Sequence, residues 1–138
     1  MRRLWHVFMA PGESEQPLPI PESPWHAGRA ARVPEEHWQQ ILEFAHTVDD
    51  AGADELERAS FLENESARQW SADDSRALGD LLQRMIERLP AAPPLTPEVT
   101  DDILEPYSPA EHVRMVQAVQ SVIAESLRLG QPFESWVD

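Results

Sequence analysis

The sequence predicts a mainly α-helical protein: a small helical bundle preceded by an extended, proline-rich N-terminal arm. Apolar residues recur at helical spacing over three long stretches, residues that cap helices precede these stretches, and no run alternates apolar and polar residues convincingly. Since the chain has 138 residues, of which 41% are hydrophobic, it is long enough for one domain with its own core.

The first 33 residues form the expected arm. They contain five prolines, of which Pro17, Pro19 and Pro21 alternate with apolar residues, a pattern that favours an extended, polyproline-like path. Because the apolar side chains between these prolines gain from burial, we expect residues 1–33 to pack on the helical domain, residues 34–138. A ligand for a proline-recognising domain is the alternative.

The arm begins with a short apolar stretch, residues 4–10, behind two arginines. This stretch contains His6, is shorter than the apolar region of a typical secretory signal, and runs into Pro11 and Gly12 without a small-residue cleavage site. We therefore expect a short β-strand or an extended segment that packs on the domain, rather than a cleaved signal.

The first helix is expected to begin at Pro34, because proline suits the first helical position and the two glutamates that follow complement the helix dipole. Gly52 is the expected stop. From Asp54 to Trp70 the periodicity is weaker, and it allows a short helix that includes Leu56.

The next helix has the clearest start. Ser71 is a suitable N-cap with Asp74 three residues later, close to a capping box, and apolar residues at helical spacing follow until Pro90 ends the run. A short helix is expected over residues 96–104.

The last long helix begins at a full capping box, residues 108–111, and is closed by Gly130. The tail that follows carries Phe133 and Trp136. We expect this tail to fold back, so that both aromatic side chains dock on the bundle.

The composition excludes several classes of function. With 25 acidic residues against 11 basic ones, all of them arginine, the formal net charge is −14. Repulsion between this charge and phosphate argues against direct binding of nucleic acid or of an anionic membrane. The absence of lysine and cysteine excludes Schiff-base, P-loop and thiol chemistry. Since no apolar run approaches the roughly 20 residues of a membrane span, we expect a soluble, cytoplasmic protein.

No set of residues forms a catalytic signature, so we expect a protein that is not an enzyme and uses no cofactor. Glu43 and His46 have the Glu-x-x-His spacing of di-iron helical bundles, but this spacing occurs once. Because Asp49 and Asp50 follow within one turn of His46, a local ion pair explains the histidine without a metal. A small helical enzyme or metal protein, and an oligomerisation module, are the alternatives.

Acidic density is the main functional signal. Ten acidic residues lie between Glu43 and Asp74, against Arg58 and Arg68. Most such runs form a solvated surface, which is one interpretation. The other is a protein interface, because aromatic residues are interleaved with the acids and an anchor inside a charged rim is typical of tight interfaces. The predicted partner-binding residues are Asp49, Asp50, Asp54, Glu55, Glu57, Phe61, Glu63, Glu65, Trp70, Asp73 and Asp74.

A surface of this charge attracts a basic protein and raises the rate at which the two associate. Basic proteins with clefts for nucleotides or nucleic acid are the natural partners, because an inhibitor of such a cleft offers carboxylates where the substrate offers phosphates.

Two stretches of the chain resemble the small, acidic, mainly helical immunity proteins that are encoded beside bacterial polymorphic or secreted toxins. In residues 69–78 a Ser-Ala-Asp-Asp sequence begins a helix, and in residues 129–136 a glycine, an aromatic residue and a tryptophan follow a closing helix. The resemblance covers residues 38–138 loosely and transfers no individual functional residue. It implies an inhibitor that binds a cognate toxin and occludes its active site through the acidic surface. The alternative is an acidic phosphate mimic that inhibits a nucleic-acid-binding protein, as phage anti-defence inhibitors do.

Overall fold

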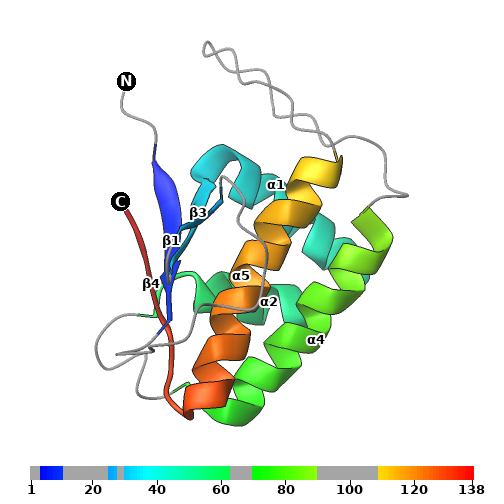
Figure 1. Ribbon diagram of the computed structural model, residues 1–138. Coiled ribbons are helices and arrows are strands. Elements are labelled where there is room, and N and C mark those ends of the chain that lie inside the picture. The colour runs from blue at the N-terminus through cyan, green and yellow to red at the C-terminus, as the bar shows by residue number, and fades with distance from the viewer. Residues whose placement is uncertain (1–3, 11–24, 28–29, 63–69, 90–108) are drawn as a thin grey trace.

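The computed structural model describes residues 4–10, 25–27, 30–62, 70–89 and 109–138 (Figure 1). Three expectations concern residues outside this description: the extended path of residues 11–24, the helix over residues 96–104 and the cap at Ser108.

Helices make up most of the described chain, so the prediction of a mainly helical protein is confirmed. The helices are α1 (Glu35–Val48), α2 (Asp50–Ala59), α4 (Ala72–Arg88) and α5 (Pro109–Leu129), and the strands are β1 (Trp5–Met9), β2 (His26–Ala27), β3 (Ala30–Pro34) and β4 (Glu134–Val137). The strands form one antiparallel sheet in the order β2-β3-β1-β4, which the sequence did not predict. None of the described helices combines the length and the apolar character of a membrane span.

The position of β1 in the sheet explains why its sequence does not alternate. His6, Val7 and Phe8 are buried in succession, so that residues on both faces of this strand are covered. A strand covered on both faces does not show the pattern of a half-exposed one. The narrower expectation of a strand or extended segment over residues 4–10 is confirmed.

The N-terminal and C-terminal strands lie side by side (Figure 1). Backbone hydrogen bonds join Trp5 and Asp138 in both directions, at 3.0 and 2.9 Å. The tail therefore folds back as expected, but as a strand. Phe133, just before β4, is fully buried, whereas Trp136 is half-buried.

The first helical stretch contains two helices. Asp49 has an extended backbone, with φ at −160°, which ends α1 at Val48, and its carboxylate accepts a hydrogen bond of 3.0 Å from the Gly52 N–H and so caps α2. The expected stop at Gly52 is wrong. Because the aspartate satisfies a free N–H group of a new helix, the chain restarts there and Gly52 lies in the first turn of α2.

The two later helices are confirmed where the structure describes them. Ser71 and Asp74 form a capping box at the start of α4, with side-chain-to-backbone hydrogen bonds of 3.0 Å in both directions. Helix α5 ends before Gly130, whose φ of +65° lies in the left-handed region that glycine adopts without strain. Figure 1 shows α4 and α5 packed side by side.

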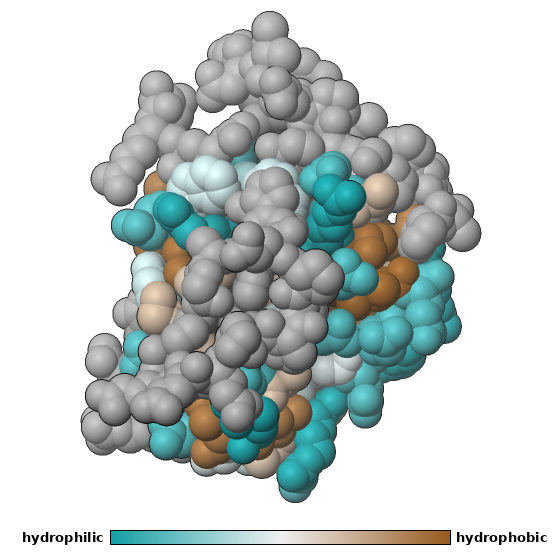
Figure 2. Space-filling model, viewed as in Figure 1, coloured by the Kyte–Doolittle hydropathy of each residue, from teal (hydrophilic) through white to brown (hydrophobic). Residues whose placement is uncertain are grey.

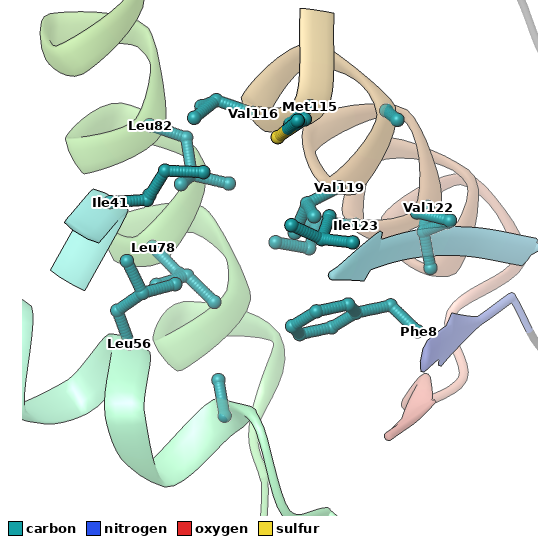
Figure 3. Packing of buried hydrophobic residues seen from close by; sticks show 14 of the residues in the cluster. Phe8, Ile41, Leu56, Leu78, Leu82, Met115, Val116, Val119, Val122 and Ile123 are labelled. Carbon is teal, nitrogen blue, oxygen red and sulfur yellow. The ribbon is translucent and has the colours of Figure 1, made fainter. Parts of the chain in front are cut away.

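One core joins the sheet to all four helices. Figure 3 shows Phe8 of β1 pointing toward the helices, among residues such as Leu56, Leu78 and Ile123. In α1, the fully buried Trp38 donates a hydrogen bond of 2.9 Å from Nε1 to Ser60 Oγ, just after α2. This hydrogen bond joins α1 to the end of α2, and α2 carries four of the eleven predicted partner-binding residues.

Candidate functional site

Those of the predicted acidic residues that the structure describes lie on and just before α2 and at the start of α4. Helix α2 packs on α1 and on α4, so its exposed side chains adjoin both neighbours. Hydrophilic residues also follow the right-hand edge of the molecule in Figure 2, where Figure 1 places α4. The acids fall into two groups, one next to α1 and the other next to α4.

The first group is a stripe along α2. Asp50, Asp54 and Glu57 are four and three residues apart, which places them on one helix face, and all three are exposed. Phe61 follows at the same spacing just beyond the helix, with 55% of its surface exposed. We call these four residues the α2 stripe.

His46, in the last turn of α1, faces the α2 stripe. Its Nδ1 lies 2.6 Å from Asp50 Oδ1, which confirms the predicted local ion pair. Side-chain atoms of His46, Asp54 and Glu57 all lie within 4.8 Å of one another. The hydrogen bond to Asp50 raises the pKa of His46, and the charges of the other two carboxylates add to the rise. The α2 stripe therefore already stabilises one cation, the imidazolium of His46.

The cluster around His46 has the donor types of a metal site, but its geometry suits an ion pair better. Within the described residues, the group whose potential ligand atoms all lie within 4.8 Å of one another comprises His46, Asp54 and Glu57, and does not include Glu43. All three side chains are exposed, and the carboxylates around His46 raise its pKa, so a metal ion would compete with a proton for the imidazole.

The second group lines a groove of about 230 Å³ between α2 and α4, which we call the α2–α4 groove. The charged residues of its lining are Asp49, Glu55, Asp74, Asp80 and Arg84. Four carboxylates thus surround the groove, against one guanidinium.

The floor of the α2–α4 groove is apolar. Gly52, Ala77, Leu78 and Leu81 complete the lining, and both leucines are core residues. A Cβ atom at Gly52 would lie 3.2 Å from Leu81 Cδ2 and 3.1 Å from the Asp49 carboxylate. The glycine therefore keeps this end of the groove open.

Two arginines of the chain bind carboxylates of the groove. Arg84 Nη2 lies 3.1 Å from Asp49 Oδ2, and Arg58 Nη2 lies 3.4 Å from Glu55 Oε2 and 3.8 Å from Asp74 Oδ2. Because these side chains are substantially exposed, water and salt screen the pairs and each contributes little to stability.

Helix capping also keeps two of the carboxylates charged. The N–H of Gly52 lowers the pKa of Asp49, and Arg84 adds to this effect. The N–H of Ser71 lowers the pKa of Asp74. Asp49 and Asp74 therefore have structural roles at the starts of α2 and α4 in addition to any role toward a partner.

Trp70, predicted as an interface anchor, lies in the core. Only 5% of its surface is exposed, its Nε1 donates a hydrogen bond of 2.8 Å to Ser75 Oγ, and its ring lies edge-on to Phe133. Arg58 covers the ring from outside, at 4.9 Å from its centroid. Phe61 is thus the aromatic residue of the predicted set that is available on the surface.

Asp73 lies apart from both groups. It is exposed and pairs with Arg76 Nη1 at 2.7 Å, within the first turns of α4. Glu63 and Glu65 lie outside the described residues.

Asp80 belongs to the site but was not predicted from the sequence. It lies beyond the acid-rich run that ends at Asp74. The sequence pattern that could have drawn attention to Asp80 is its position one turn before Arg84 on the same helix. Within the described residues Asp80 forms no ion pair, in contrast to the other three carboxylates of the groove. It also borders a wider hollow of about 500 Å³ between α4 and α5, whose lining includes Arg76.

No protein-family model matches this chain, and no curated protein or solved structure matches it either.

Proposed function

We propose that this chain is an immunity protein, which binds a cognate bacterial toxin in the cytoplasm and occludes the toxin's active site with its acidic surface. The proposed surface comprises the α2 stripe and the α2–α4 groove. It does not include the buried Trp70.

The proposal is carried by one observation: acids from separate parts of the sequence occur together on the exposed sides of α2 and the adjoining side of α4. Asp54, Glu57 and Asp80 have no ion pair with any described residue. Asp54 and Glu57 share with Asp50 the single cation of His46, so negative charge is left over on this surface, where it would attract a basic partner. A purely solvated surface needs neither the exposed Phe61 nor a groove between the helices.

The expected mechanism is steric blockage with charge complementarity. The negative field draws the basic cleft of the toxin toward α2 and speeds association, most strongly at low ionic strength. At contact, Phe61 supplies an apolar anchor and the carboxylates occupy positions that substrate phosphates would take.

The test is reversal of the α2 stripe. The Asp50→Lys, Asp54→Lys, Glu57→Lys variant should associate with the product of a neighbouring toxin gene at least about tenfold more slowly at low salt. It should also fail to protect cells that express the toxin. A control variant, Glu87→Lys with Glu134→Lys, reverses two exposed acids outside the stripe and the groove and should associate at a rate close to that of the wild type.

Thermal unfolding of both variants separates lost binding from lost folding. If the folded stripe variant keeps the wild-type association rate and still protects cells, this surface is not the binding surface. Acidic mimicry of phosphate, directed at a nucleic-acid-binding protein, uses the same carboxylates. This phosphate-mimic function would be favoured if the chain competes with DNA for such a protein and if no toxin gene lies in its genomic neighbourhood.

A further inference from the structure

We propose that the α2–α4 groove is a receptor for one side chain of the partner, an arginine. This inference rests on the proposed function, because it takes the basic protein bound by the acidic surface and names the group that enters the groove.

The shape and the polarity of the groove match the two parts of an arginine side chain. The floor of Gly52, Ala77, Leu78 and Leu81 is apolar and suits the three methylene groups of the stem. The carboxylates around it suit the guanidinium at the end of the stem. A volume of about 230 Å³ is sufficient for one such side chain.

The chain's own arginines show that these carboxylates accept guanidinium groups. Arg84 binds Asp49 at one end of the groove, and Arg58 reaches both Glu55 and Asp74 across the two helices. The Arg58 contacts, at 3.4 and 3.8 Å, are long and exposed, so a guanidinium from outside can compete for these acids.

Asp80 is the carboxylate of the groove that pairs with neither Arg58 nor Arg84. It lines the groove, it is exposed, and within the described part of the chain it has no ion pair. Charge complementarity therefore favours a cationic occupant placed between Asp80 and Glu55. Arginine suits this place better than lysine, because its planar group can donate to two carboxylates at once.

The experiment uses the full chain and small blocked amino acids, so it does not require the natural partner. Nα-acetylarginine amide is titrated while amide resonances are followed by NMR, with the citrulline analogue as an uncharged probe of the same shape. We expect saturable shifts at Gly52 and Ala77 with the arginine probe, weaker shifts with the lysine analogue, and none with citrulline.

Variants assign the binding to the groove. Asp80→Asn and Glu55→Gln should each weaken arginine binding about twofold to fivefold, the range of an exposed charge pair. Ala77→Leu should fill the groove and abolish the shifts at Gly52. Glu134→Gln, which removes an exposed acid on β4, is the matched control and should leave the affinity unchanged.

Three results would overturn the proposal. One is equal chemical-shift changes at Glu134 and at the groove, and another is an unchanged arginine affinity in both the Asp80→Asn and the Glu55→Gln variants when they are folded. The third is the absence of shifts at the highest soluble probe concentration. The arginine-receptor proposal and the immunity function can be refuted separately. A toxin that binds Asp80→Asn and Ala77→Leu normally refutes the arginine receptor only, whereas an arginine-binding groove on a chain that binds no toxin refutes the immunity function only.

Discussion

At the scale of single residues, the burial of His6 links stability to pH. His6 is 2% exposed, its ring lies between Trp38 and Phe61, and neither of its nitrogens has a hydrogen-bond partner among the described residues. Burial without a partner disfavours the charged imidazolium and lowers the pKa of His6 from 6.5 to about 4. Burial lowers the pKa of His112 as well.

The free energy of unfolding should therefore fall as the pH falls from about 6.5 to about 4. In this window the unfolded chain binds a proton that the folded His6 does not, so the stability is complete above the window and is lost within it. Each pH unit within the window costs up to about 1.4 kcal/mol per such histidine. Urea unfolding at pH 7.5, 6.0 and 5.0 measures the slope, and His6→Leu should reduce it.

His46 provides a control of opposite sign. Its pKa is raised by Asp50, so whatever it contributes is present at low pH and disappears as the pH rises through the raised pKa. His46→Gln should leave the acid destabilisation intact. A His6→Leu variant with the full wild-type slope would contradict this account of His6.

At the scale of single elements, the capping box of α4 should be measurable by itself. Ser71→Ala removes the acceptor for the Asp74 N–H and should lower the free energy of unfolding by about 1 kcal/mol. Ser71→Asp keeps a good cap and should lie close to the wild type. Chemical unfolding of the three proteins makes the comparison, and an Asp variant as unstable as the Ala variant would show that the cap is not the cause.

The junction between β4 and the end of α2 combines a backbone hydrogen bond of 3.0 Å, from the Ser135 N–H to the Leu62 carbonyl, with two bonds of one hydroxyl group. Ser135 Oγ accepts a hydrogen bond of 2.7 Å from the Leu62 N–H and donates one to the Ala59 carbonyl, all in a buried environment. Ser135→Ala should therefore cost about 1–3 kcal/mol, because buried backbone groups lose their partner. Thermal unfolding tests this expectation, and an unchanged midpoint would mean that other groups replace the serine.

At the scale of the whole molecule, the net charge of −14 opposes folding through repulsion among the acids. Raising the ionic strength from about 0.01 M to 0.15 M shortens the screening length to about 8 Å and should raise the thermal midpoint. A falling midpoint would instead show that the surface ion pairs outweigh the repulsion. The same salt change should slow association with a basic partner, so stability and binding are expected to respond in opposite directions.

The helices could be predicted because their signals are local. The capping residues of α4 and the glycine after α5 lie within one turn of the backbone groups that they satisfy. The break between α1 and α2 also has a local signal, because Asp49 is a capping residue. Gly52, three residues later, gave the competing signal of a helix end. The sheet could not be predicted in this way, because β4 owes its conformation to β1, more than 120 residues earlier in the chain.

The candidate site shows the same division. Composition and spacing located the acids, and helical periodicity was enough to place Asp50, Asp54 and Glu57 on one face. The sequence by itself therefore determined the helices, the charge and the stretch that carries it. Only the tertiary structure decided that Trp70 is buried, that Asp80 joins Glu55 across a groove, and that Arg58 and Arg84 neutralise part of the surface, because each of these depends on how α2 packs against α4.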